Sequence, residues 1–136
     1  MLYLNLGVNT DSKLTTAVPE EEKYSGVCEK VDTTTMHDIL VESRVLKTPE
    51  ELVVMRWASW ITSEAHCTVM QKIRPGQRES QLESFFNYDC QQKYFCGRVA
   101  PYTSICGCGP GAGTLHYHHN DKWMKDGEVV LTDQGH

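Results

Sequence analysis

Apolar side chains recur every three or four positions between residues 49 and 73, and this spacing predicts a long amphipathic helix. Thr48 is a suitable N-cap with a proline after it, and Glu51 follows three residues later, as in a capping box. A Pro-Gly pair ends the pattern. We therefore expect a helix from Pro49 to Lys72. Its predicted buried face consists of Val54, Trp57, Ala58, Ile61, Ala65, Val69 and Ile73.

A second helical pattern covers residues 79–94, and prolines and glycines then argue against further helix. We expect a strand near Tyr102–Cys106, a glycine-rich turn, a second strand around Thr114–Tyr117, and a last strand that begins at Val129 after an Asp-Gly turn. The predicted buried face of this second helix consists of Leu82, Phe85, Phe86, Cys90 and Tyr94.

The first forty residues have weaker periodicity. The segment "LYLNLGV" alternates like a strand, "TTAVPEEEKYSG" is typical of a loop, and the β-branched segment "ILVESRVLK" (residues 39–47) predicts a strand. A mixed N-terminal segment, two helices and then strands are the order of an α+β fold with an antiparallel sheet.

Composition narrows the function classes. The 136 residues suit one domain with a sizeable core, and the formal net charge is −5 with no block of Lys or Arg. Nucleic-acid binding and docking to an anionic membrane are therefore not expected. No apolar run is long enough for a membrane span and no signal-peptide pattern opens the chain, which favours a cytoplasmic protein with its six cysteines reduced.

Several motifs between residues 96 and 119 suggest chemistry. Cysteine and histidine are zinc ligands, but the spacing matches no common zinc module, and neighbouring strand residues point to opposite sides. "GCGPGAG" lacks the Lys-Ser/Thr of a phosphate loop, which favours a hairpin connection. A cysteine nucleophile would need His116 as its base and a third, orienting group. The zinc candidates are Cys106, Cys108, His116, His118 and His119, and the thiol candidates are Cys96, Cys106 and Cys108.

Asp133 follows the apolar run Val129–Leu131. A carboxylate at a strand end can bind a hard divalent cation, and a nearby neutral histidine such as His116 can orient or stabilise a substrate oxygen. A strand-end aspartate more often caps a turn. Spacing alone therefore favours the turn cap, and leaves a carboxylate metal site as an incomplete alternative.

The segments "LGVNTDS", "ESRVLKTPEELVVMRWASWITSEAH", "ESQLESFF", "YTSICGCGPGAGTLHYHHN" and "DGEVVLTDQG" carry a family resemblance. In this order they resemble the prolidases, the Xaa-Pro dipeptidases of the pita-bread metallopeptidase family, over nearly the whole chain. The resemblance implies the first, incomplete part of a pita-bread catalytic fold. Residues 1–41 would be the C-terminal remnant of the family's N-terminal domain and linker, and residues 42–136 the opening of the catalytic domain.

The resemblance also implies site residues. Asp133 in "LTDQG" matches the family's first metal-ligating aspartate, and His116 in "LHY" matches its substrate-contacting histidine. Tyr102 and Ile105 match positions that line the substrate pocket. Complete members hold two Mn²⁺ ions per site, cleave dipeptides with a C-terminal proline, and form homodimers.

The departures from the family decide what this chain is expected to do. Only the first of the family's metal ligands has a counterpart, and one carboxylate does not supply the donors that a dinuclear centre needs. We therefore expect a fragment that is inactive alone. The alternative is a non-catalytic module, derived from the pita-bread fold, that binds a peptide or protein.

Overall fold

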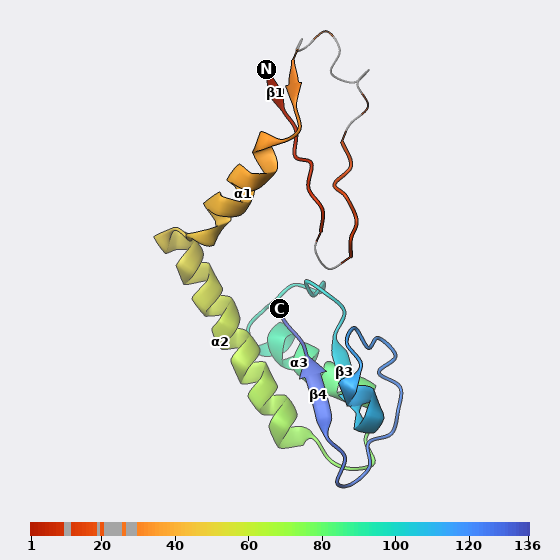
Figure 1. Ribbon diagram of the computed structural model, residues 1–136. Coiled ribbons are helices and arrows are strands. Elements are labelled where there is room, and N and C mark those ends of the chain that lie inside the picture. The colour runs from red at the N-terminus through yellow and green to blue at the C-terminus, as the bar shows by residue number, and fades with distance from the viewer. Residues whose placement is uncertain (10–11, 19, 21–25, 27–29) are drawn as a thin grey trace. The chain divides into compact units, whose positions relative to one another are not determined.

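The computed structural model describes residues 1–9, 12–18, 20, 26 and 30–136 (Figure 1). Half of the predicted loop over residues 15–26 (residues 19 and 21–25) therefore lies outside the described residues. The chain divides into two compact units, Met1–Glu51 and Leu52–His136, where its length had suggested one domain.

In the first unit the short strands β1 (Leu2–Tyr3) and β2 (Val31–Asp32) pair in parallel, and helix α1 (Thr35–Val45) follows. The strand predicted over residues 39–47 is wrong, because most of that segment lies in α1. The Asp32 carboxylate accepts hydrogen bonds from the N–H groups of Thr34 and Thr35, at 2.7 and 2.9 Å, and so satisfies the free donors of the first turn.

The same contacts account for the electrostatics of Asp32. Hydrogen bonds lower the pKa of Asp32 to about 2. The bond from the Thr35 hydroxyl has the largest effect, and the bonds from the backbone N–H groups of Thr34 and Thr35 come next. Helix α1 buries none of its residues. It therefore has no core-facing stripe that a periodicity argument could have found.

Helix α2 runs from Pro49 to Lys72, as predicted. The capping box is present, since Glu51 Oε2 accepts from the Thr48 N–H at 2.8 Å and Thr48 Oγ1 accepts from the Glu51 N–H at 3.2 Å. The predicted face is buried only in its later part, at Ile61, Ala65 and Val69. The expected burial of Val54 and Trp57 is wrong, because their exposed fractions are 64% and 53%.

Helix α3 (Glu79–Lys93) confirms the second predicted helix and buries Leu82, Phe86 and Cys90 on its inner face. Phe85 and Tyr94 are half-buried against the same core. The face also buries two carboxylates that the apolar pattern did not include, those of Glu79 and Asp89. Asp89 accepts hydrogen bonds from the Thr68 hydroxyl and from Lys93 Nζ, the latter at 2.7 Å.

Strands β3 (Ile105–Cys108) and β4 (Val130–Asp133) form an antiparallel pair in which Ile105 lies opposite Asp133. The 3₁₀ helix η2 (Gly109–Gly113) follows β3. The strand predicted at Thr114–Tyr117 is wrong: the chain there is irregular, with the left-handed φ of His116 (54°) inside the segment.

The core of the second unit lies between α2, α3 and the β3–β4 pair (Figure 1). This arrangement confirms the α+β class, with its antiparallel strands. Among the described residues, no helix combines the length and the apolar character needed to cross a membrane. The buried apolar core comprises Ile61, Ala65, Val69, Leu82, Phe86, Cys90, Cys106, Cys108 and Met124.

Candidate functional site

One pocket of the second unit contains all four site residues that the family resemblance implied, and we call it the site pocket. It has a volume of about 670 Å³. Ile105 opens β3 and Asp133 closes β4, so the sheet register itself puts these two side by side. Its full lining is Tyr102, Thr103, Ile105, His116, His118 and Asp133.

Tyr102 and Asp133 are joined directly in this pocket. The Tyr102 hydroxyl donates to Asp133 Oδ1 at 2.8 Å, although the two residues are 31 positions apart in the chain. Burial, followed by this hydrogen bond and the negative charge of Asp133, raises the pKa of Tyr102 to about 12. The tyrosine therefore stays protonated and acts as a donor to the carboxylate at neutral pH.

His116 and His118 lie on the irregular loop after η2, with their rings nearly parallel and the centroids 6.4 Å apart. Tyr117 between them is buried and points the other way, so alternate residues of this loop line the pocket. The Tyr117 hydroxyl donates to Glu79 Oε2 at 2.9 Å. The histidines are thus anchored through their neighbour to α3.

Glu79 holds this loop against the sheet. Its fully buried carboxylate accepts from the N–H of Cys108 at 2.7 Å and the N–H of Lys122 at 3.0 Å, as well as from Tyr117. Burial by itself raises the pKa of Glu79. The hydrogen bonds from Cys108, Lys122 and Tyr117 outweigh it, so the pKa lies below the ordinary value of 4.5.

Asn120 makes a second anchor to α3, at Glu83, which lies one helical turn after Glu79. Its side-chain oxygen accepts from the Cys106 N–H at 2.9 Å, while its amide nitrogen donates to Ser104 O at 2.8 Å and Glu83 Oε2 at 3.2 Å. Asn120 has a left-handed φ of 46°, which asparagine tolerates better than most residues. Side-chain hydrogen bonds of Asn120 thus hold the chain that follows the segment predicted as a strand at Thr114–Tyr117.

The sequence analysis missed Glu79 and Asn120 as supports of the site. Glu79 carried a usable signal, because it lies three and seven residues before Leu82 and Phe86 on one helical face. A carboxylate on a buried face requires several donors. For Asn120, the neighbouring residues in the sequence carry no signal of a supporting role.

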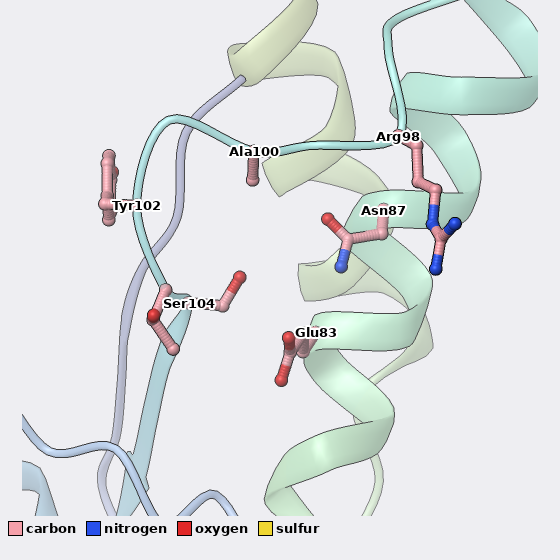
Figure 2. Close-up of a pocket in the computed structure, with 7 residues that line it drawn as sticks. Glu83, Asn87, Arg98, Ala100, Tyr102 and Ser104 are labelled. Carbon is pink, nitrogen blue, oxygen red and sulfur yellow. The ribbon is translucent and has the colours of Figure 1, made fainter.

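A second pocket lies beside the site pocket and shares Tyr102 and Thr103 with it. Figure 2 shows Glu83 and Asn87 on α3, facing the segment that carries Ala100 and Ser104. Arg98 lies at the start of that segment (Figure 2). The lining is mainly polar, and the two charged side chains do not form an ion pair within the 4.0 Å limit among the described residues.

The structure weighs against the thiol and phosphate-loop interpretations. Burial first, and acidic neighbours second, raise the pKa of Cys106 to about 12 and that of Cys108 to about 11, so neither is poised as a thiolate nucleophile. The glycine-rich segment forms η2 and is not followed by an α-helix N-terminus.

The metal-binding capacity of the described residues is small. The site pocket offers one carboxylate, Asp133, and the imidazoles of His116 and His118. Within the ranges that the structure describes, no three or more His, Cys, Asp or Glu residues are grouped so that they could hold a metal ion. This finding weighs against the local zinc site suggested by the cysteines and histidines.

Comparison with known proteins places this geometry in a family. The model described as metallopeptidase family M24 matches residues 54–136. The chain is 40% identical over 134 residues to the Xaa-Pro dipeptidase of Mus musculus, an alignment that covers 95% of this chain and 26% of the mouse protein. It is 38% identical over 97 residues to the Xaa-Pro aminopeptidase of Escherichia coli K12, covering 71% of this chain and 22% of that protein.

The structure agrees with the sequence comparison. Aminopeptidase P from E. coli, solved with the inhibitor Pro-Leu, superposes with a TM-score of 0.71 at 33% identity and covers 84% of this chain and 26% of that one. The chain has part of the pita-bread fold, and it spans about a quarter of the length of the curated relatives it matches. Membership of a metallopeptidase family implies a divalent metal. Because the family model covers more than half of its residues, this chain belongs to metallopeptidase family M24.

Proposed function

We propose that this chain supplies one side of the catalytic site of an Xaa-Pro dipeptidase, which hydrolyses dipeptides with a C-terminal proline. The observation that carries the proposal is the site pocket, where Tyr102, Ile105, His116 and Asp133 lie together. Similarity to Xaa-Pro dipeptidases over 95% of the chain supports the choice of substrate class.

In this proposal Asp133 is a metal ligand, and Tyr102 orients its carboxylate by donating to Oδ1 and leaving Oδ2 for a cation. Two Mn²⁺ ions, when bound, would supply an activated water and polarise the scissile carbonyl. The described residues fit this centre only in part, because they provide one carboxylate where several oxygen or imidazole donors are required.

The other two residues would contact the substrate. Ile105, with an exposed fraction of 6%, contributes an apolar side chain to the lining of the pocket, which suits a proline ring. His116 lines the same pocket from the loop held by Tyr117. Its imidazole would donate to the substrate or to the oxyanion that develops on the carbonyl oxygen.

We further propose that the chain by itself does not hydrolyse peptides. One carboxylate and two loop imidazoles do not fix two divalent cations, so the activated water is not generated. The assignment of residues 1–41 to the remnant of an N-terminal domain and the formation of a homodimer remain predictions from the resemblance, and a cytoplasmic location remains a prediction from the sequence pattern.

The proposal is tested by adding Mn²⁺ to the ¹⁵N-labelled chain and following paramagnetic broadening of the amide signals. We expect broadening centred on Asp133 and Tyr102 that the Asp133→Asn variant loses. Asp126→Asn changes an exposed aspartate in the turn before β4 and should leave it intact. Broadening that is scattered over the surface, or that survives Asp133→Asn, would contradict a metal role for Asp133.

Gly-Pro added to the same samples separates the two functions. Shifts confined to Tyr102, Ile105 and His116 support a dipeptide site, and absence of proline release supports inactivity of the isolated chain. Gly-Pro binding that is unaffected by Mn²⁺ and by Asp133→Asn would favour the alternative, a metal-free module that binds peptides. The observation that favours this alternative is that no three or more His, Cys, Asp or Glu residues among those described are grouped so that they could hold a metal ion.

A further inference from the structure

The end of α3 folds back on itself and brings two cysteines together. The helix ends at Lys93, and Phe95 then takes a left-handed conformation with φ of 56°. The chain reverses there, so that the N–H of Cys96 donates to the carbonyl oxygen of Cys90 at 3.1 Å. Cys96 therefore lies against the last turn of the helix, next to the backbone of Cys90.

This hydrogen bond limits how far apart the two cysteines are. With ordinary backbone bond lengths, an N···O contact of 3.1 Å keeps the two Cα atoms within about 7 Å. Disulfides occur at Cα separations of about 4.4 to 6.8 Å. Both side chains also face the same apolar core, Cys90 within it and Cys96 packed against its edge.

The two thiols differ in their access to solvent. Cys90 is completely buried, and burial first and Cys96 second raise its pKa to about 11. Cys96 is half-buried and is therefore the thiol that a reagent meets first. Both are reduced thiols in the structure. The effect of Cys96 on the pKa of Cys90 is consistent with the backbone contact that holds the two residues together.

We propose that Cys90 and Cys96 form an oxidative modification site, at which a low-molecular-weight disulfide of the glutathione class converts the two thiols into an intramolecular disulfide. This inference goes beyond the proposed peptidase function and does not depend on it.

The reaction is two successive thiol–disulfide exchanges. The Cys96 thiolate attacks one sulfur of the small disulfide, forms a mixed disulfide and releases one small thiolate. The Cys90 thiolate then attacks Sγ of Cys96, forms the Cys90–Cys96 bond and releases the second small thiolate. The protein loses two electrons and two protons, and the small disulfide is reduced to two thiols.

Proximity makes the second exchange possible although Cys90 is a weak acid. The backbone contact holds Cys90 beside Cys96 throughout, so its attack is intramolecular and proceeds at a high effective concentration. Cys67 is exposed on the outer surface of α2, and its reaction should end at the mixed disulfide. Cys106 and Cys108 are buried, with raised thiol pKa values and no comparable access.

Tryptic cleavage provides a direct test on the unmodified sequence, because Lys93 lies between the two cysteines. Cleavage after Arg78, Lys93 and Arg98 releases residues 79–93 and 94–98, which hold one cysteine each. After incubation of the folded chain with oxidised glutathione and alkylation of free thiols, we expect these peptides as one disulfide-linked species. Its mass should be two hydrogens below the sum of the two reduced peptides.

Three results would overturn the proposal. The peptide 94–98 could carry only glutathione, the peptide 79–93 could be fully alkylated, or the peptide 79–93 could be linked to residues 99–122, which contain Cys106 and Cys108. Cys67→Ser is the matched control and should leave the 79–93/94–98 species unchanged. In Cys96→Ser the thiol of Cys90 should remain alkylatable, and a cross-link from 79–93 that persists would contradict the pairing.

Discussion

Tyr102 and Asp133 form a single hydrogen bond that connects the segment before β3 with the end of β4. Burial accounts for the largest part of the raised pKa of Tyr102, and the bond and charge of Asp133 account for the rest. In Asp133→Asn we therefore expect the pKa of Tyr102 to fall from about 12 part of the way toward the ordinary value of 10.0.

The measurement is a spectrophotometric titration of tyrosinate, with Tyr102→Phe used to identify the transition of Tyr102. Tyr117 provides an internal control, since burial and Glu79, not Asp133, raise its pKa to about 12. An unchanged Tyr102 transition in Asp133→Asn would show that the carboxylate does not act on the phenol in solution.

Glu79 anchors the irregular loop after η2 that carries His116 and His118, here called the histidine loop, through the Tyr117 hydroxyl and the Lys122 N–H. In Glu79→Gln an amide nitrogen replaces one acceptor that faces backbone and hydroxyl donors, and we expect the free energy of unfolding to fall by about 2 kcal/mol at pH 7. Urea denaturation measures this loss. Glu64→Gln, at an exposed position of α2, is the control and should change it by less than about 0.5 kcal/mol.

The same residue gives the acid dependence a definite sign. Because the pKa of Glu79 is lower in the folded state than its ordinary value of 4.5, its stabilisation is complete above pH 4.5. It is lost as the pH falls from there through the folded pKa. Glu79→Gln should therefore flatten the loss of stability below pH 4.5. Asp89, whose pKa is also lowered, should maintain part of the slope.

At the scale of elements, α3 supports the site because its inner face is fully packed. Leu82 on that face has an exposed fraction of 0%, whereas Leu115 on the histidine loop is 82% exposed. Leu82→Ala should lower the free energy of unfolding by about 2 to 5 kcal/mol, because it leaves a cavity in the core. Leu115→Ala changes the same atoms at the surface and should have almost no effect. Equal effects in chemical denaturation would contradict this assignment of the core.

The helices show what the sequence could predict. Helix α2 was predicted with both ends correct, because a capping box and a Pro-Gly pair are local signals. Residues 39–47 were predicted as a strand from their β-branched composition, but most of them lie in α1, which buries none of its residues. Local signals at the two ends of α2 were therefore enough to predict it, although the first part of its predicted face is exposed.

The site residues likewise fall into those that the sequence predicted and those that it did not. Tyr102, Ile105, His116 and Asp133 were selected through a family resemblance, and the structure brings them to one pocket, although their roles remain predictions. The supports of that pocket, Glu79 and Asn120, depend on contacts between residues 29 to 43 positions and 14 to 37 positions apart, respectively. Contacts over such separations leave little trace in a local pattern.

For the whole molecule, the exposed apolar surface of α2 has a consequence in solution. Val53, Trp57 and Trp60 are spaced by four and three residues on one helical face, with exposed fractions of 63%, 53% and 51%. Such a stripe favours association. Sedimentation velocity should show the isolated chain associating with rising concentration, and Trp57→Lys should shift it toward the monomer.

Met70→Lys is the control for this experiment, because Met70 is 66% exposed on the same helix but off the stripe. Association that responds equally to both variants would indicate a general effect of charge on the chain, whose net charge is −5. Monomeric behaviour of the unmodified chain at all concentrations would contradict the prediction itself.

The bond between Tyr102 and Asp133 also sets an order of events during synthesis. Asp133 is translated 31 residues after Tyr102. The bond therefore cannot form, and the pocket cannot be completed, until Asp133 has left the ribosome. By then the segments of α2 and α3 have already been translated, and their short-range contacts can form within microseconds. The helices can therefore form before the pocket exists, and a nascent chain arrested before Asp133 would have helical segments but no site.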